Sequence, residues 1–331
     1  MKALVTGAGG FLGRYIVEQL IARGDAVRCF ARGEYPALDV LGAETIRGDV
    51  RDANAVLRAC DSVDVVFHTA AVAGIWGPWE HFYSINTTGT ENVIAACRQQ
   101  GVARLVYTSS PSVTFDGSDQ LGVDESAPYA AEWLCHYPHT KALAEQRVLA
   151  ANDMETLRTC ALRPHLIWGP RDSHLIPRLL NRARSGRLRQ VGEGHNLIDM
   201  VYVSNAAEAH LQAADSLQTS TAAAGKAYFI SQGEPVNCWQ WINDVLALAG
   251  IDSIQKKISL KAAWRVGATL ETIYRLARIQ REPPMTRFLA AQLATAHYFD
   301  ISAAKAEFGY APSVSIEAGM RRLGEEIAPP S

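Results

Sequence analysis

The feature that most constrains this chain is a group of glycines directly after its first apolar run. Residues 2–6 (KALVT) have the composition of a short strand, and Gly7, Gly10 and Gly13 follow, ahead of a helical apolar pattern that starts at Leu12. A glycine inside a regular element costs about 1 kcal/mol relative to alanine, so such a cluster indicates a sharp turn or a close approach to the backbone. At a strand-to-helix junction this spacing is typical of a loop that holds a pyrophosphate at a helix N-terminus.

Strands and helices alternate through the first half of the chain. Apolar runs predict strands at 26–31, 44–47, 63–68, 104–108 and 156–163, and helical spacing predicts helices at 52–60, 88–99 and 137–151. Because these strands are apolar along nearly their whole length, we expect both faces of their sheet to be covered, as in a parallel, doubly wound fold. The prediction is an α/β protein with a Rossmann fold, whose residues 1–165 form an NADP-binding domain.

Beyond residue 165 the pattern becomes irregular, with short strands expected at 199–203 and 227–230 and with frequent glycine and proline. We expect some of these strands and helices to return to the first domain. Residues 166–331 are otherwise predicted to form mainly a smaller, irregular substrate-binding region at the carboxyl edge of the sheet, where ligands of such folds bind.

The composition argues against several classes of function. The chain has 32 lysines and arginines and 34 aspartates and glutamates, which gives a net charge of −2. This charge provides no general attraction for nucleic acid, so we do not expect nucleic acid as a partner. The six cysteines show neither metal-ligand spacing nor a disulfide framework, and no histidine or carboxylate group has ligand spacing. We therefore expect no metal and a reducing, cytoplasmic location. No apolar run is long enough for a transmembrane segment.

The end of the second strand bears on the choice of dinucleotide. An acidic side chain there would bind the adenosine ribose and repel a 2′-phosphate, but this chain has Arg32 instead. Since an arginine can pair with a phosphate dianion, NADP(H) is favoured, and NAD(H) remains the alternative if Arg32 is only a solvated surface residue. Asp49 is placed to contact the adenine edge, although Asp49 or Asp52 could equally cap a helix.

A YxxxK pair and a serine cluster suggest the chemistry. Tyr137 and Lys141 are one helical turn apart, so both face the same way, and the lysine is expected to lower the pKa of the phenol. Taken alone, such a pair could be an ordinary surface pair. However, the strand 104–108 runs into Ser110 and Ser112, which places hydroxyls at the same sheet edge as the glycine turn. A carbonyl oxygen held between Ser110 and Tyr137 would receive a proton as hydride reaches its carbon.

These motifs occur in an order that resembles the extended short-chain dehydrogenase/reductase family over essentially the whole chain. The matching stretches are Gly7 to Gly13, Asp49-Val50, His68 to Ala71, Asn86 to Thr90, the Ser110 region, Tyr137 to Lys141 and Arg163 to Pro170. The resemblance implies that Ser110, with Ser112 as the alternative, acts with Tyr137 and Lys141 in catalysis. It also implies that the cofactor contacts Gly7, Gly10, Phe11, Leu12, Gly13, Arg32, Asp49, Val50, Thr69, Ala70, Ala71, Tyr137, Lys141, Pro164, Leu166 and Ile167.

Further stretches, such as LVYTSSPSVTFDG and RPHLIWGPRDSHLIPRLL, resemble the branch of 3β-hydroxysteroid and sterol-4α-carboxylate dehydrogenases. Within that branch the chain is similar to bacterial reductases of 2-alkyl-3-oxoalkanoates in long-chain olefin biosynthesis. That likeness implies NADPH-dependent reduction of a β-keto acid to a β-hydroxy acid, with Tyr137 as proton donor. The alternatives are a steroid or sterol dehydrogenase, a nucleotide-sugar epimerase or dehydratase, and a non-catalytic NADP-binding regulator. A homodimer through the Tyr137 helix, and association with other pathway enzymes, are expected by resemblance.

The second half offers candidates for the substrate, which is expected to be a small molecule with an apolar acyl or ring body. A substrate carboxylate could be met by one of several arginines, namely Arg178, Arg182, Arg184, Arg187, Arg189 and Arg287, although a solvated helix face explains most of them. An apolar helical stripe over 264–281, bordered by arginines, could line an acyl tunnel, lie on a membrane or dock on a partner, with plain core packing as the default. We assign none of His68, His139 and His165 to catalysis.

Overall fold

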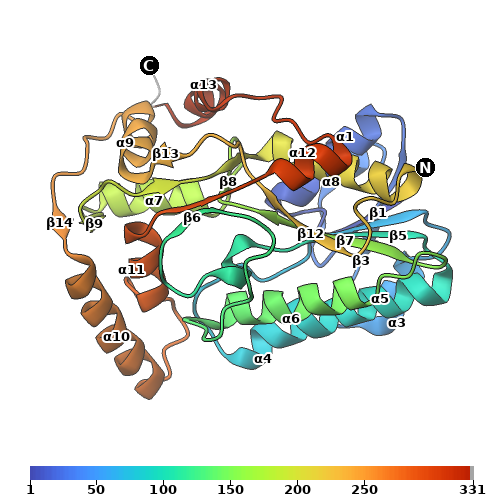
Figure 1. Cartoon of the computed structure of the whole chain (residues 1–331), viewed down its shortest axis with the longest axis horizontal. Coiled ribbons are helices and arrows are strands. Elements are labelled where there is room, and N and C mark those ends of the chain that lie inside the picture. Colours follow the sequence, from blue (N-terminus) through green and yellow to red (C-terminus); the bar gives the residue numbers. More distant parts are fainter. Residues whose placement is uncertain (329–331) are drawn as a thin grey trace.

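A parallel sheet of seven strands forms the centre of the protein, shown in Figure 1 as a computed structural model that describes residues 1–328. Residues 329–331, the end of the predicted substrate region, lie outside the described part. The strand order is β12-β7-β5-β4-β1-β2-β3, and every neighbouring pair is parallel. The strands are β1 (Lys2–Thr6), β2 (Ala26–Ala31), β3 (Glu44–Arg47), β4 (Val65–His68), β5 (Arg104–Thr108), β7 (Arg158–Pro164) and β12 (Lys226–Ile230). The predicted α/β, doubly wound Rossmann fold is therefore confirmed.

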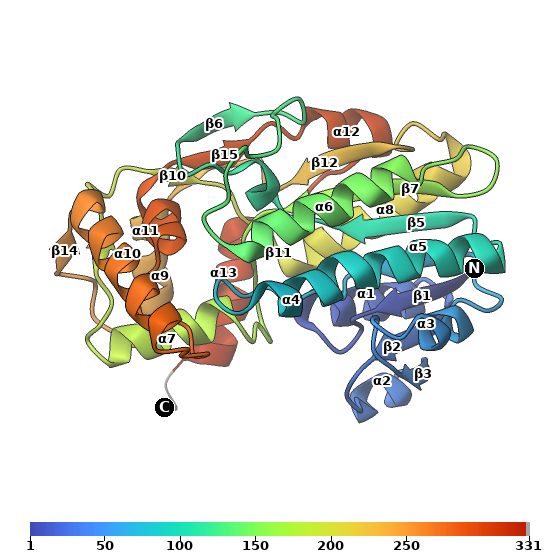
Figure 2. The same ribbon diagram turned by 90° about the horizontal axis from the view of Figure 1, so that it is seen from below.

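Helices cover both faces of this sheet, as the apolar strands predicted. On one face lie α1 (Phe11–Ala22) and α8 (Val203–Thr219), with α12 (Ser302–Phe308) against α8, and on the other lie α3 (Ala53–Ala59), α5 (Gly89–Gln100) and α6 (His136–Ala150) (Figures 1 and 2). Each layer has its own apolar core. Ile16 and Leu20 of α1 are buried in the first, and Val93 of α5 and Val148 of α6 in the second. These two cores hold the carboxyl edge of the sheet in place.

The remaining elements form a smaller region at the carboxyl edge, around a third apolar core that includes Trp168, Tyr202 and Trp241. Its strands form a four-stranded sheet, β13-β10-β15-β6, and the pairs β11-β8 and β14-β9. They are β6 (Gln120–Val123), β8 (Ile167–Trp168), β9 (Gln190–Val191), β10 (Leu197–Ile198), β11 (Val201–Tyr202), β13 (Val236–Asn237), β14 (Lys257–Ile258) and β15 (His297–Phe299). The helices here are α7 (Leu175–Arg184), α9 (Cys238–Leu248), α10 (Leu260–Leu276), α11 (Arg287–Ala294) and α13 (Ile316–Ile327).

Short helical segments complete the chain: α2 (Pro36–Val40), α4 (Trp79–Phe82), the π-helical η1 (Tyr83–Thr88) and the 3₁₀ turn η2 (Pro111–Thr114). The single strand expected at 199–203 is wrong. Ile198 ends β10, Val201 and Tyr202 form β11 against β8, and Val203 already begins α8. Residues 199–203 are thus divided among a connection, a two-residue strand and the start of a helix, and the local pattern cannot show this because the division depends on which distant strand pairs with β11.

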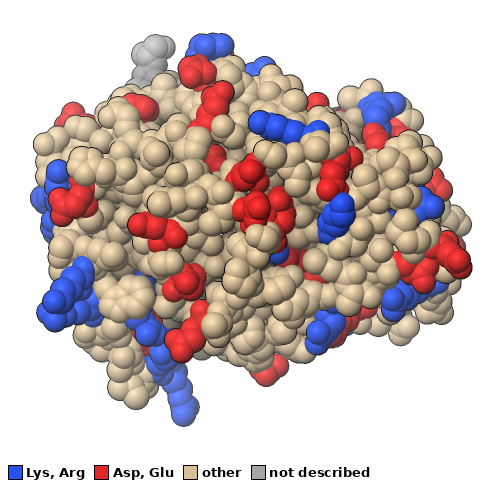
Figure 3. Space-filling view, in the orientation of Figure 1, with Lys and Arg blue, Asp and Glu red and all other residues tan. Residues whose placement is uncertain are grey.

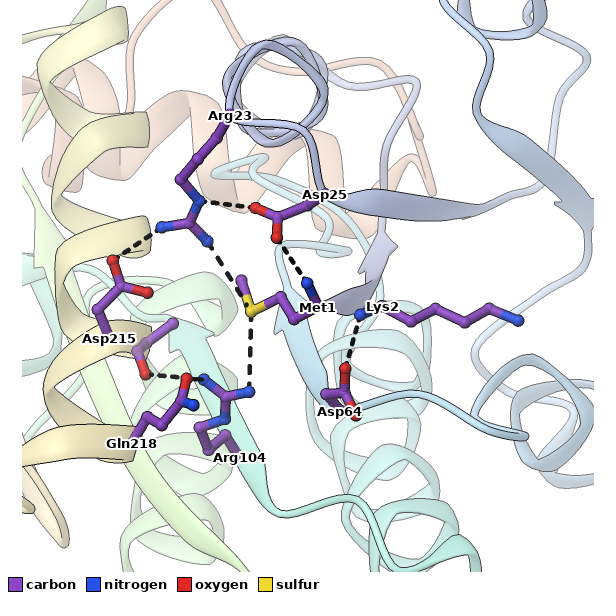
Figure 4. A network of polar contacts seen from close by, with 9 residues as sticks. Met1, Lys2, Arg23, Asp25, Asp64, Arg104, Asp215 and Gln218 are labelled. Carbon is purple, nitrogen blue, oxygen red and sulfur yellow. Dashed lines mark hydrogen bonds and ion pairs between the residues drawn. The ribbon is translucent and has the colours of Figure 1, made fainter.

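A network of polar contacts ties the amino edge of the main sheet together (Figure 4). The terminal ammonium of Met1 donates to Asp25 at 2.9 Å, and Arg23 donates to Asp25 at 2.6 Å and to Asp215 of α8 at 2.7 Å. Burial on its own would raise the pKa of the Asp25 carboxyl, but the hydrogen bonds from the terminus and from Arg23 outweigh it and lower that pKa. The network joins the α1–β2 turn to α8 at the end of the sheet remote from the glycine turn.

Candidate active site

The glycine turn between β1 and α1 needs glycine at two positions for different reasons. Gly7 has φ +71°, and a Cβ added to it would lie 2.8 Å from the backbone nitrogen of Ala70. A Cβ on Gly13 would lie 2.3 Å from the carbonyl oxygen of Gly7, so α1 can pack on the turn only without a side chain there. Gly10 precedes the helix without any side-chain cap, and the first turn holds no acidic residue. The free N–H groups and the helix dipole therefore suit a pyrophosphate.

A first cavity extends from this turn to the ends of β2 and β3. It is lined by Gly7, Gly9, Gly10, Phe30, Ala31, Arg32, Tyr35, Gly48, Asp49, Val50, Thr69, Ala70, Ala71 and Ile85. Asp49 accepts hydrogen bonds from Arg51, and that contact lowers the pKa of its carboxyl although burial opposes the shift. The cap of α3 is Asp52, which accepts from the backbone nitrogens of Asn54 and Ala55. Of the two roles considered for Asp49, the helix cap is therefore provided by Asp52 instead.

A second cavity of about 420 Å³ begins at the same glycine turn and extends to the carboxyl ends of β5 and β7. Among the residues that line it are Gly7, Gly10, Phe11, Leu12, Gly13, Thr69, Ala71, Ser110, Ser112, Tyr137, Lys141, Pro164, Leu166 and Ile167. Every residue that was predicted for catalysis or cofactor binding lines one of these two cavities. The two cavities meet at Gly7, Gly10 and Thr69, so a dinucleotide could run from Arg32 to Tyr137.

Ser110, Tyr137 and Lys141 come together because β5 ends and α6 begins at the same edge of the sheet. Lys141 is buried, its Nζ donates to the carbonyl of Thr108 at 2.5 Å, and it lies 4.1 Å from the ring centre of Tyr107. Burial lowers the pKa of Lys141 to about 7, although the nearby Glu145 carboxylate acts to raise it. The Ser110 hydroxyl is 2.8 Å from that of Ser112, so both serines that were considered share one hydrogen-bonded site.

The prediction that Lys141 lowers the pKa of the Tyr137 phenol is wrong. Burial raises the pKa of Tyr137, and the contact that opposes this rise is a hydrogen bond with Ser110. The physical reason is that the ammonium of Lys141 is directed at Thr108 and Tyr107 and is itself weakly basic when buried. A phenol with a raised pKa keeps its proton at neutral pH, and here that phenol lies within hydrogen-bond reach of Ser110.

The far end of the second cavity is mostly apolar and is built by segments distant in sequence. Ile75, Phe115, Leu175, Phe288 and Phe299 line it, with Gln120, His174, Gln292 and His297 as polar groups. Sequence reasoning missed these residues, as it missed Tyr35 in the first cavity. They carry no motif, and only the packing of α11, β15 and β6 against the sheet edge brings them together.

The arginines considered for a substrate carboxylate do not line this cavity. Arg178 pairs with Glu282, Arg182 donates to the carbonyl of Pro284 at 3.1 Å, and Arg287 pairs with Glu271 at 2.8 Å. Arg178 and Arg182 thus hold the segment between α10 and α11 against α7, whereas Arg287 joins α11 to α10. No arginine is among the residues that line the second cavity, so none of these candidates is placed there to bind a substrate carboxylate.

The histidines are placed as structural groups. Both ring nitrogens of His68 contact threonine hydroxyls, and His139 stacks on Trp133 with ring centres 5.2 Å apart on the outer side of α6. His165 does line the second cavity, where its Nδ1 donates to the carbonyl of Asp199 at 2.8 Å and burial holds its pKa well below the usual range. Within residues 1–328 no group of three or more histidine, cysteine or acidic side chains is placed to hold a metal ion.

A glycine turn on a parallel sheet, next to serine, tyrosine and lysine side chains at the carboxyl edge, defines an oxidoreductase of the extended short-chain dehydrogenase/reductase class. The chain belongs to the 3-beta hydroxysteroid dehydrogenase/isomerase family, whose model matches residues 4–262.

Individual relatives agree with this assignment. The chain is 52% identical over 326 residues to a 2-alkyl-3-oxoalkanoate reductase of Stenotrophomonas maltophilia (strain K279a), with 98% of each chain covered. It is 35% identical to a decarboxylating sterol-4-alpha-carboxylate 3-dehydrogenase of Mus musculus, which covers 97% of this chain and 89% of the relative. Among solved structures, MoeE5 in complex with UDP-glucose and NAD aligns with a TM-score of 0.72 at 25% identity, covering 98% of both chains. Over the described residues, we find no helix that combines the length and apolar character needed to span a bilayer.

Proposed function

We propose that this chain reduces the ketone of a 2-alkyl-3-oxoalkanoate, a β-keto acid, to the 3-hydroxy acid with NADP(H). The observation that carries the proposal is that one cavity is lined both by the glycine turn and by Ser110, Tyr137 and Lys141. The identity of 52% with a reductase of that name supports the same reaction. Family membership already makes the chain an oxidoreductase that acts on CH–OH groups or the matching ketones.

Each of the three side chains has a distinct task. A nicotinamide held in this cavity would supply the hydride that the ketone carbon accepts. Tyr137, protonated at neutral pH because burial raises its pKa, gives its proton to the ketone oxygen. Ser110 donates a hydrogen bond to the same oxygen and so stabilises the negative charge that develops there. Lys141 is held over Tyr107 by the Thr108 carbonyl, in a position to bind the ribose beside the nicotinamide.

The preference for NADP(H) rests on Arg32. Arg32 lines the first cavity and has no acidic partner among the described residues, whereas the nearest acid in sequence, Glu34, pairs with Arg47 at 3.4 Å. A free guanidinium at this place favours a 2′-phosphate. We expect Arg32→Asp to shift the ratio of kcat/KM from NADPH toward NADH. Arg58→Asp, exposed on α3 and outside both cavities, serves as a control that leaves the ratio unchanged. An unaltered ratio in the Arg32 variant would mean that the 2′-phosphate is not read there, and NAD(H) would then replace NADP(H) in the proposal.

The substrate class follows from the walls of the cavity. Phenylalanine and aliphatic side chains suit an acyl body, and the hydroxyl of Ser112 and the amide of Gln292 are polar groups that could donate to a carboxylate. A sterol carboxylate, the substrate class in the name of the mouse relative, would use the same groups and is the second candidate. A nucleotide sugar would bring its diphosphate into a cavity that no arginine lines. A non-catalytic regulator would have no need for a tyrosine and a lysine beside the nicotinamide.

A panel assay separates these functions. NADPH oxidation is followed by absorbance with β-keto acids, 3-ketosteroids and sugar nucleotides. We expect turnover with β-keto acids, and Tyr137→Phe should lose most of it while the affinity for the dinucleotide is kept. Tyr83→Phe, on the outer side of the same layer, is the matched control. Turnover of the Tyr137 variant above about a tenth of the wild-type value would refute its role as proton donor.

Three wider expectations belong to the same proposal. Residues 1–165 bind the dinucleotide, and the later part mainly binds the substrate. All six cysteines are unpaired thiols, as suits a reducing compartment, which supports a cytoplasmic enzyme. A homodimer through a contact that includes α6, and contact with other pathway enzymes, rest on the family likeness and can be tested by light scattering.

A further inference from the structure

Helix α10 stands at the outer end of the smaller region, remote from the main sheet (Figures 1 and 2). Its inner side is fastened to α11. A Cβ on Gly267 would lie 2.6 Å from the backbone of Thr286, and the buried Glu271 accepts hydrogen bonds from the backbone nitrogen and the guanidinium of Arg287. Trp264 packs beside Phe115 and Phe288, two residues of the cavity wall. The inner face of α10 is therefore part of the support of the reaction cavity.

The outer side of α10 is apolar and has no partner in the described part of the chain. Val266 is 44% exposed, Ile273 is 50% exposed and Leu276 is 81% exposed. With 3.6 residues per turn, Val266 and Ile273 lie about 20° apart around the axis, and Leu276 lies about 60° beyond Ile273. Ala262 and Thr269 fall on the same side. The helix thus has a covered inner side, which holds the buried Glu271, and an uncharged outer stripe that no other segment covers in the described part of the chain.

The exposed charges around this outer stripe are all positive. Lys261 and Arg265 follow one border of the stripe, and Arg278 and Arg281 come directly after the helix. Arg275 lies on the other side, where it pairs with Glu271 at 3.7 Å. Glu271, the sole acid between residues 260 and 281, is buried and neutralised by Arg287. Figure 3 shows Lys and Arg side chains projecting at the lower left, where α10 lies in Figure 1. A chain with a net charge of −2 therefore gathers cations around its most exposed apolar helix face.

We propose that the outer face of α10 docks in the plane of an anionic phospholipid surface. Leu276, Ile273 and Val266 would enter the boundary between headgroups and acyl chains, and the basic side chains would contact the lipid phosphates. A second protein with a neutral or basic face would leave these cations unpaired, so their concentration at the border of the stripe favours lipid. Because Trp264 on the opposite side of the same helix supports the cavity wall, docking would bring the reaction cavity close to a source of apolar molecules. This inference does not depend on which substrate is reduced.

Vesicle sedimentation with the full chain tests the proposal. The probes are vesicles of phosphatidylcholine alone and of phosphatidylcholine mixed with phosphatidylglycerol. We expect binding to the anionic vesicles, weakening of that binding with added salt, and little binding to the neutral ones. Absence of wild-type binding to anionic vesicles at low salt would overturn the proposal.

Two sets of variants locate the contact. Leu276→Glu should lower partitioning at least tenfold, since a leucine that no longer enters the interface forfeits its transfer free energy. Lys261→Gln, Arg265→Gln and Arg278→Gln together should lower it on the order of a hundredfold, at about fivefold per basic side chain. Val40→Glu and Arg58→Gln, exposed on α2 and α3, are the matched controls, and thermal melts verify that all variants fold. Equal binding by the α10 variants and the controls would refute the assignment of α10. A change of oligomeric mass in Leu276→Glu without vesicle binding in the wild type would show that the face joins copies of the chain instead.

Discussion

The positive charge of the buried Lys141 should lower the free energy of unfolding of this protein, compared with a variant that has an uncharged side chain at this position. Burial lowers the pKa of Lys141 from its ordinary value of 10.5 to about 7, and the side chain is 2% exposed. Above the ordinary value neither the folded nor the unfolded chain carries the proton. As the pH falls, the unfolded chain takes it up first, so stability is lost progressively until the pH passes below about 7.

The size of the effect follows from that interval. Each pH unit between the two pKa values changes the free energy of unfolding by about 1.4 kcal/mol, so the whole interval corresponds to roughly 5 kcal/mol. The Lys141→Met variant keeps most of the side-chain volume and removes the proton. We therefore expect it to unfold at higher urea concentration than the wild type at pH 6, and the advantage to shrink as the pH rises.

The assay is urea unfolding of the cofactor-free protein at several values between about pH 6 and pH 9. The quantity compared is the difference in unfolding free energy between Lys141→Met and the wild type. Lys261→Met, which removes an exposed ammonium on α10, is the matched control and should show no such slope. A difference for Lys141 that stays constant with pH would refute the conclusion that burial lowers its pKa.

Two further predictions concern the glycine turn and the inner face of α6. Gly13→Ala should weaken NADPH binding at least tenfold, because the new Cβ would lie 2.3 Å from the Gly7 carbonyl oxygen and displace the turn. Calorimetry measures this affinity, and an unchanged value would contradict the close packing. Glu145→Gln should lower the free energy of unfolding, measured in urea, by about 3 kcal/mol. Arg163 donates to Glu145 at 2.6 Å and is 3% exposed, so the variant would leave a buried charge without its counter-ion. A loss below about 1 kcal/mol would contradict this reasoning.

The site residues that could be predicted all belong to short, local patterns. Gly7, Gly10 and Gly13 lie within seven residues, and their spacing indicates a tight turn of the backbone. Tyr137 and Lys141 are four residues apart, which places them on the same face of a helix. Apolar runs likewise predicted the strands of the main sheet to within two residues at most ends. These features are encoded locally, because a turn, a helix face or a covered strand depends on the residues next to it in the chain.

Other features were decided by the tertiary structure. Tyr35, Phe288 and His297 line the two cavities only because distant segments meet at the sheet edge, and Arg287 is removed from the substrate by a pairing with Glu271 that no spacing indicates. The expected effect of Lys141 on the pKa of Tyr137 failed for the same reason. The charge of a buried group depends on how much water and which counter-charges surround it, and that environment is assembled from the whole fold.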